Sequence, residues 1–224
     1  MENPPDREVL KDSLEAMIID ISVPIDESMI LWPGNSHPKF KRLYSMKRGS
    51  THNEISIEMN THTGTHIDAP RHFVLNGKAI DQMDPNIFVG PTWVVNMPDV
   101  KEIKSSNLEK LKLPRSIERI LFKTANSSLW NKKNPKFRKD YVGLTPDAAS
   151  WLVKRKIKLV GIDYLSIAKF TDVLAVHRIL LKAGIIILEG LNLSKVKKGK
   201  YQLVCLPIKI ANAEAAPVRA ILIK

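Results

Sequence analysis

The chain has 224 residues, and its 35 Lys and Arg side chains against 23 Asp and Glu give a net charge of +12. Hydrophobic content of 44% and charged content of 26% are typical of a globular protein, and no apolar run reaches the roughly 20 residues of a membrane span. The single cysteine, Cys205, excludes an internal disulfide and a thiolate metal site, and its apolar surroundings predict a buried side chain.

The positive charge is concentrated in residues 101–160, which hold 16 Lys and Arg against 5 Asp and Glu. A basic stretch of this kind either binds nucleic acid or forms a solvated face. No aromatic residues alternate with the lysines and no nucleic-acid motif accompanies them. We therefore favour a solvated face, and we expect neither nucleic acid nor a membrane as a partner.

The first elements lead toward a histidine-rich run. Residues 1–16 are polar with a short helical pattern, which predicts a peripheral N-terminal segment. They lack the basic and apolar regions of a signal peptide, so we expect that the protein is not exported and is cytoplasmic. Residues 17–24 predict a strand ended by Pro24, and the alternation over 53–60 predicts a half-buried strand that leads into residues 62–73.

The rest of the chain predicts more strands than helices. Thr145 and Pro146 begin one helix, and a second runs over 172–183, capped by Thr171 or Asp172 and ended by Gly184. Further strands are predicted at 90–97, 119–124, 158–163 and 185–189, with two more from Tyr201 onward. The strand at 185–189 is continuously apolar, which predicts burial on both faces. Residues 123–141 are the best candidate for a surface loop. Because no repeat or linker divides the sequence, we expect one domain over residues 1–224.

The histidine-rich run is the most informative feature of the sequence. Residues 62–73 read HTGTHIDAPRHF, which places His62, His66, Asp68 and His72 within one short segment. A continuous strand would separate the first and last histidines by about 33 Å. A strand end that breaks at Gly64 and curls lets His62, His66 and Asp68 converge on one ion, whereas the alternative is a polar turn whose histidines cap backbone groups.

Two distant residues also need an explanation. Glu189 ends a buried strand, where a carboxylate needs a cation or dense hydrogen bonding, unless it is simply an exposed residue that starts a turn. His177 lies among apolar residues of the second helix and on its own is typical of a core-edge histidine. Packing of that helix and strand beside the first cluster would bring both residues into one site.

The chain resembles the cyclase/kynurenine formamidase family of metal-dependent hydrolases. Residues 62–72 match the family signature HxGTHxDxPxH, and the likeness extends from Asp20 to the C-terminus. It includes Trp32-Pro33-Gly34, residues 161–167 (GIDYLSI), and the pair His177 and Glu189. The resemblance implies an α/β fold of the swivelling β/β/α type, with mixed sheets and flanking helices, that forms a homodimer or larger oligomer.

The resemblance also implies roles for individual residues. His62, His66 and Asp68 would bind one divalent metal, and Asp68 would bridge to a second ion held by His177 and Glu189. His72 would be the general acid/base, and Trp32 would line the substrate pocket. Zinc is the first choice of metal and manganese the second.

The implied reaction is hydrolysis of an aryl formamide by a metal-bound hydroxide, with N-formylkynurenine, cleaved to kynurenine and formate, as the leading substrate. A cyclic amide such as isatin is the alternative within the same class, and a basic binding protein with a structural metal is the alternative outside it. Thr65 stands where bacterial tryptophan-pathway formamidases tend to have a small residue. The resemblance therefore supports the metal ligands more strongly than it supports the substrate. It does not explain the basic residues 101–160.

Overall fold

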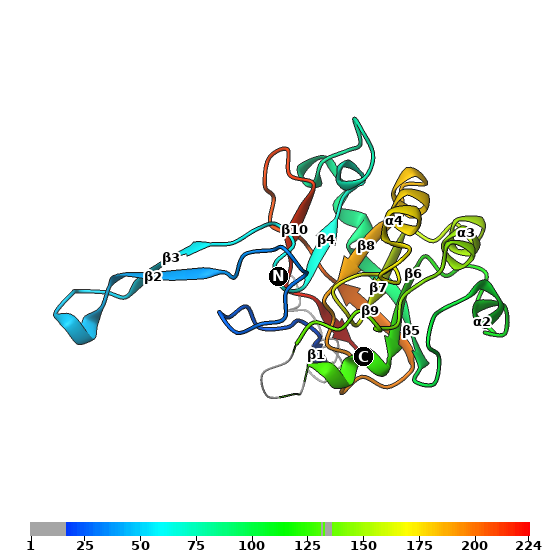
Figure 1. Cartoon of the computed structure of the whole chain (residues 1–224), viewed down its shortest axis with the longest axis horizontal. Coiled ribbons are helices and arrows are strands. Elements are labelled where there is room, and N and C mark those ends of the chain that lie inside the picture. Colours follow the sequence, from blue (N-terminus) through cyan, green and yellow to red (C-terminus); the bar gives the residue numbers. More distant parts are fainter. Residues whose placement is uncertain (1–16, 131, 133–135) are drawn as a thin grey trace, which may run out of the picture.

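A large mixed sheet organises the protein (Figure 1). The computed structural model describes residues 17–130, 132 and 136–224, so the expected peripheral segment 1–16 lies outside the described residues. The strands are β1 (Ile18–Asp20), β2 (Lys39–Tyr44), β3 (Glu54–Glu58), β4 (His66–Asp68), β5 (Val89–Met97), β6 (Arg119–Thr124), β7 (Leu159–Ile162), β8 (Ile186–Glu189), β9 (Gly199–Val204), β10 (Ala215–Pro217) and β11 (Ile221–Ile223). The α-helices are α2 (Ser105–Glu109), α3 (Pro146–Lys154) and α4 (Val173–Lys182), and 3₁₀ turns lie at Met46–Arg48, Pro70–His72, Ile80–Gln82, Pro85–Ile87 and Ala125–Leu129.

In the described part of the chain, nine strands form the main sheet in the order β1-β11-β9-β5-β6-β7-β8-β4-β10. The central strands β5 to β8 are parallel, and the strands on either side pair antiparallel. Every residue of β7 and β8 is buried, as expected for parallel strands covered on both faces. The predicted strand at 185–189 is therefore confirmed, and helix α4 begins after Asp172 rather than after Thr171.

Alternate residues of the central strands enter two separate parts of the core. Ile120, Phe122 and Ile187 pack with Leu152 of α3 and Leu180 of α4 in a cluster that also includes α2. Residues of the opposite face pack against the outer strands β9 and β11, because the sheet curls over itself (Figure 1). This arrangement, with strands on one side of the central sheet and helices on the other, confirms the α/β fold of the β/β/α type.

Two further expectations can be compared with the structure. Cys205 is fully buried, and burial raises the pKa of its thiol to about 12, so the side chain behaves as a small apolar residue. Among the described residues, every helix is too short or too polar to cross a bilayer.

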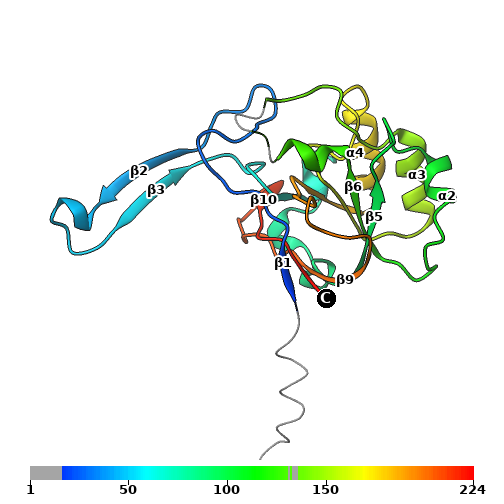
Figure 2. The same cartoon turned by 90° about the horizontal axis from the view of Figure 1, so that it is seen from below.

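The hairpin of β2 and β3 forms a separate two-stranded sheet that projects from the rest of the protein (Figure 2). We call residues 39–58 the arm. The alternation over 53–60 correctly predicted a strand, Glu54–Glu58. The prediction that this strand is half-buried was wrong, because all five of its residues are exposed. No other part of the described chain covers either face of the strand.

A buried hydroxyl joins the segments that start β4 and end β8. Thr65 Oγ1 accepts a hydrogen bond from the Val23 N–H at 2.9 Å and donates one to the Gly190 carbonyl at 2.6 Å. Gly190 has φ +70°, and a Cβ there would lie 2.5 Å from the carbonyl oxygen of Gly64, so only glycine permits this approach. Thr65 therefore has a structural role in placing β4 beside β8.

We expect Thr65→Val to lower the free energy of unfolding by about 1–3 kcal/mol, because it leaves a buried N–H and a buried carbonyl without their partner. Thr65→Ser is the matched control, since it keeps the hydroxyl. Urea denaturation of the three proteins measures the difference. Equal stability of the valine variant and the wild type would contradict the role assigned to this hydroxyl.

Candidate functional site

The register between β4 and β8 brings the sequence-predicted residues together. The two strands pair antiparallel, with His66 opposite Glu189 and Asp68 opposite Ile187. His62 lies in the loop before β4, and His72 lies in the 3₁₀ turn Pro70–His72 that follows it. Helix α4 packs on β8 and carries His177 to the same place. All six charged or imidazole side chains predicted from the sequence therefore meet at the end of β8.

Asp68 and Glu189 lie at the centre of this cluster. Asp68 Oδ1 lies 3.1 Å from His62 Nδ1 and 3.5 Å from His66 Nε2. Glu189 Oε2 lies 3.4 Å from His66 Nε2, and Oε1 lies 3.2 Å from His177 Nε2. His177 Nε2 is also 3.8 Å from Asp68 Oδ2. The structure thus brings into one cluster residues that lie more than a hundred positions apart in the chain.

The central polar atoms are buried, and three of them lack a hydrogen bond. His66, Asp68, His177 and Glu189 are each at most 3% exposed. Within the described part of the chain, His66 Nε2 and both carboxylate oxygens of Asp68 have no hydrogen-bond partner. A buried, ionised carboxylate needs a neighbouring positive charge, which a protonated imidazole such as His62 or a metal ion supplies. The mixed imidazole and carboxylate donors are those that zinc and manganese accept.

Two groups of donor atoms are compact enough to hold a metal ion. One is His66, Asp68 and Glu189, and the other is His62, Asp68 and His72; in each, the donor atoms lie within 4.8 Å of one another. Asp68 belongs to both groups, which suits a carboxylate shared by two ions. His72 lies among the possible ligands, and its ring centroid is 4.3 Å from that of His62.

Backbone hydrogen bonds orient the buried groups. His66 Nδ1 lies 2.9 Å from the Gly64 carbonyl, and His177 Nδ1 lies 2.7 Å from the Val173 carbonyl. When each Nδ1 donates to its carbonyl, the Nε2 lone pair is directed at the carboxylates, as metal-binding histidines require. Glu189 Oε1 also accepts a hydrogen bond from the Ile167 N–H at 2.7 Å, which holds this carboxylate in place.

The pKa values show how strongly these groups interact. For Asp68 and Glu189, burial opposes ionisation, but the surrounding imidazoles outweigh it and hold the pKa of each carboxyl below its usual value. Burial lowers the pKa of His72. The nearby His62 and His177 lower it further, whereas the negative charge of Asp68 raises it. The site therefore presents ionised carboxylates beside a His72 imidazole that is neutral at pH 7.

Glu214 is a residue of this site that the sequence analysis missed. Its Oε1 lies 3.5 Å from His62 Nε2, on the opposite side of the ring from Asp68. The Thr61 hydroxyl donates to the same oxygen at 2.5 Å, and the Ala69 N–H donates to the Glu214 backbone carbonyl at 2.8 Å. Only the pairing of β10 with β4 brings Glu214 here, and no spacing in the sequence indicates it.

An apolar pocket opens onto the histidines and Glu189. The cavity measures about 220 Å³, and its apolar walls include Trp32, Phe73, Leu165 and Val173. Trp32, which the family resemblance places at the substrate pocket, lines this cavity, with its ring centroid 5.3 Å from that of Phe137 and 5.6 Å from that of Phe170. The pocket has the mixed apolar and polar lining of a small-molecule site.

The surface loop predicted for residues 123–141 is met only in part: among its described residues, Lys132, Lys136 and residues 138–140 are exposed. Ala125–Leu129 form a 3₁₀ turn in which Leu129 is buried, and Tyr141 is buried in the aromatic cluster around Trp32. The buried Asp163 carboxylate holds the turn by accepting hydrogen bonds from the N–H and hydroxyl groups of Thr124 and Ser127. This segment therefore supports a wall of the pocket.

Comparison with known proteins identifies the family. The family described as putative cyclase matches residues 19–169. The "Cyclase-like protein 3" of Oryza sativa subsp. japonica is 42% identical over 189 residues, which are 80% of this chain and 69% of that protein. The "Kynurenine formamidase" of Bacillus thuringiensis subsp. konkukian (strain 97-27) is 36% identical over 205 residues, which are 91% of this chain and 96% of that protein.

A solved structure agrees with the sequence matches. A protein described as a potential metal-dependent hydrolase with cyclase activity has a TM-score of 0.80 and 33% identity, and the match covers 93% of this chain and 98% of that one. The chain therefore belongs to the putative cyclase family, as the signature in residues 62–72 indicated. The kynurenine formamidase and the solved structure are hydrolases by their descriptions, and the prediction that the chain is a hydrolase is confirmed at that level.

We expect Glu214→Gln to weaken the affinity of the protein for zinc by about 10–100-fold, because an amide holds the His62 ring less firmly than a carboxylate does. Competition against a fluorescent chelator measures this affinity. Glu118→Gln is the control, since Glu118 is exposed and pairs with Lys158 away from the cluster. Unchanged zinc affinity in the Glu214 variant would show that this carboxylate does not orient a ligand.

Proposed function

We propose that the chain hydrolyses an aryl formamide, with N-formylkynurenine as the leading substrate. The observation that carries the proposal is the buried cluster around Asp68 and Glu189, of which Glu189 and the histidines line a pocket walled by apolar and aromatic side chains. The kynurenine formamidase among the relatives supports amide hydrolysis. The cyclase-like protein from rice leaves the substrate open, since its name specifies none.

Two divalent metal ions fit the donor set. His62, His66 and Asp68 would hold one ion, and His177 and Glu189 would hold the second together with Asp68. Zinc suits these ligands best and manganese also suits them. When bound, the metal supplies Lewis acidity that polarises the substrate carbonyl and lowers the pKa of a water molecule.

The protein's own side chains perform the remaining steps. Trp32 offers the aryl ring of the substrate a flat apolar surface, which directs the formamide group toward the histidines. His72 is neutral at pH 7 and takes the proton that water releases as it adds to the formyl carbon. The protonated His72 then gives this proton to the departing aniline nitrogen as the C–N bond breaks, which yields formate and the free amine.

A direct assay compares an aryl formamide, isatin and a simple lactam with the purified protein. We expect fastest hydrolysis of the formamide, loss of activity with a chelator, and recovery with zinc or manganese. If isatin were hydrolysed faster than the formamide, the proposed substrate class would be cyclic amides instead. Undiminished activity in protein freed of metal, or no hydrolysis of any of the three compounds, would contradict the proposed function.

We expect His72→Asn to lower kcat for the formamide by about 10²–10⁴-fold while metal content stays at the wild-type level, because the change removes only proton transfer. His37→Asn is the matched control at an exposed histidine. Metal analysis and steady-state kinetics on the same samples separate two roles. Loss of metal from the His72 variant would make His72 a ligand, and full activity would remove it from the mechanism.

A further inference from the structure

A buried tyrosine hydroxyl behind the pocket lacks a partner. Tyr141 is 4% exposed, and its ring centroid lies 6.4 Å from that of Trp32, 6.2 Å from that of Phe137 and 4.5 Å from that of Tyr164. Within the described residues, its hydroxyl makes no hydrogen bond. Because a buried hydroxyl without a partner destabilises the folded protein, phenylalanine would serve better if packing were the only role of this residue.

Backbone pairing places Tyr141 beside Ser166. Leu144 and Ala168 form a parallel β-bridge, which aligns the segment after Tyr141 with the segment after Ser166. A Cβ on Gly143 would lie 2.3 Å from the carbonyl carbon of Ala168, so glycine permits this close approach. The two hydroxyl-bearing side chains are therefore neighbours, although they lie 25 positions apart in the chain.

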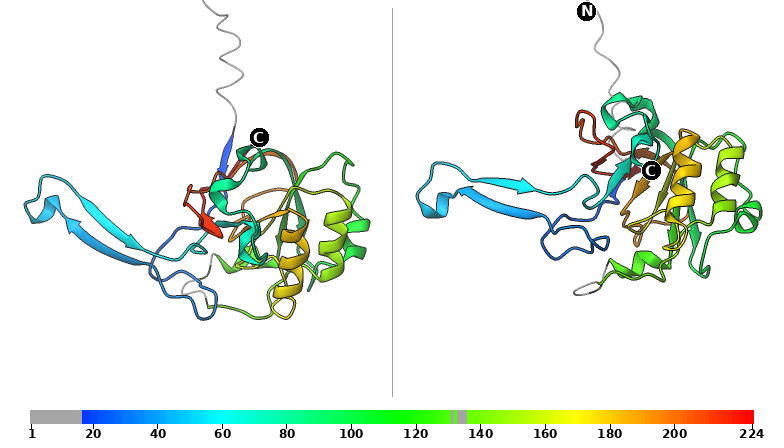
Figure 3. Two further views of the ribbon diagram at one scale, coloured as in Figure 1. Left: turned by 90° about the horizontal axis from the view of Figure 1, so that it is seen from above. Right: turned by 45° about the horizontal axis from the view of Figure 1, so that its top comes forward.

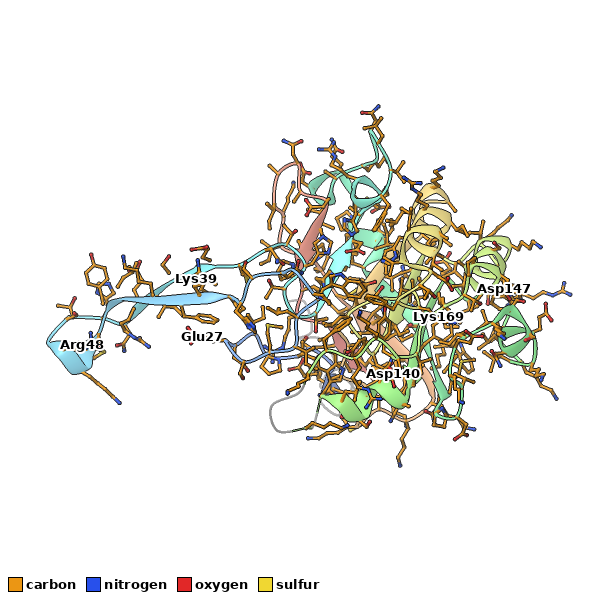
Figure 4. The ribbon with its side chains drawn as sticks, in the orientation of Figure 1. Glu27, Lys39, Arg48, Asp140, Asp147 and Lys169 are labelled. Carbon is orange, nitrogen blue, oxygen red and sulfur yellow. The ribbon has the colours of Figure 1, made fainter. Side chains whose placement is uncertain are left out.

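Both segments belong to the main body of the protein. Asp140 and Lys169, which lie next to these segments in the sequence, appear near each other in Figure 4. The arm projects on the far side of the molecule from α4 in both views of Figure 3, whereas α4 carries His177 to the pocket. The two hydroxyls thus lie in the part of the molecule that builds the site.

Ser166 brings its hydroxyl to the polar end of the pocket. It is 3% exposed and lines the cavity together with Glu189. The next residue, Ile167, donates its N–H to Glu189 Oε1 at 2.7 Å. Ser166 therefore lies beside the cluster of histidines and carboxylates, where the amide group of a substrate has to be placed for hydrolysis.

The hydrogen bonds around Ser166 leave its proton for a ligand. A serine hydroxyl accepts two hydrogen bonds and donates one. The Ala168 N–H donates to Ser166 Oγ at 3.3 Å. Burial raises the pKa of Tyr141 against the effect of the neighbouring Ser166, so the phenol keeps its proton at pH 7 and can donate to the second acceptor position. With both acceptor positions used, the Ser166 O–H is left to donate into the pocket.

We propose that the Ser166 hydroxyl donates a hydrogen bond to the carbonyl oxygen of the substrate during hydrolysis, and that Tyr141 holds Ser166 in this orientation. As water adds to the carbonyl carbon, its proton passes to His72 and the C=O electron pair moves onto the oxygen. A donor at that oxygen binds the resulting negative charge more strongly than the neutral carbonyl. The inference rests on the proposed function, because it needs a carbonyl substrate.

Steady-state kinetics on the amide that the wild type hydrolyses fastest test the role of Ser166. We expect Ser166→Ala to lower kcat by about 10²-fold with KM nearly unchanged, because the donor acts in the transition state. Ser128→Ala is the control, since Ser128 is exposed and its hydroxyl bonds to the Ala125 carbonyl. An aryl trifluoromethyl ketone, whose hydrate is tetrahedral, should bind the Ser166 variant more weakly by a similar factor, whereas the aryl amine product should bind equally to both proteins.

Tyr141→Phe separates positioning from packing. It keeps the ring and removes the unpartnered hydroxyl, so the melting temperature should not fall, whereas kcat should fall by about tenfold. In Ser166→Ala protein the same change should have no further effect on kcat, because Tyr141 acts through Ser166. Tyr201→Phe should keep wild-type kcat, since the Tyr201 hydroxyl donates to the Lys197 carbonyl away from the pocket.

Four results would overturn the inference, and they differ in what they leave standing. Wild-type kcat in Ser166→Ala protein would remove the hydroxyl from the reaction but leave the proposed function intact. Loss of metal from this variant would make Ser166 a support for Glu189 instead. A Tyr141→Phe effect of equal size in both backgrounds would show that Tyr141 does not act through Ser166. A wild type that hydrolyses none of the test compounds would overturn the proposed function and this inference together.

Discussion

The structure depends on bringing two buried carboxylates together. Asp68 and Glu189 lie on adjacent antiparallel strands, and His66 Nε2 lies within 3.5 Å of an oxygen from each. Two carboxylates of like charge in a buried position repel each other and lose hydration. The surrounding imidazoles offset part of that loss and hold the pKa of both carboxyls low. The Asp68 oxygens, which lack a hydrogen bond within the described residues, are also suited to bind a metal cation. The same positive charge is what amide hydrolysis needs.

The fold places this pair at the carboxyl end of the parallel strands, where open α/β sheets commonly bind ligands. Glu189 ends β8, and the buried Asp163 follows β7 and holds the turn that supports the aromatic wall. Gly190 permits the close approach of β4 to β8, and the Thr65 hydroxyl joins the two segments. Gly64 and Thr65 of the signature thus shape the backbone, whereas its histidines and aspartate form the groups of donor atoms that could hold a metal ion.

Local patterns predicted much of this arrangement. Continuous apolar runs identified β7 and β8, and the spacing of His62, His66 and Asp68 around a glycine identified the curl that brings them together. Family resemblance joined His177 and Glu189 to them. Glu214 escaped prediction because it reaches His62 only through the pairing of β10 with β4. The burial of β3 was mispredicted because alternation shows that one face needs cover but does not say whether the same chain supplies it.

The central claim is that the cluster around Asp68 and Glu189 is held together by divalent metal. Elemental analysis of protein purified without added metal tests it most directly, with the wild type compared against Asp68→Asn. We predict two ions per chain, zinc or manganese, in the wild type, and loss of both in the variant, because Asp68 belongs to both groups of donor atoms. A folded, active wild type that contains no metal would contradict the account.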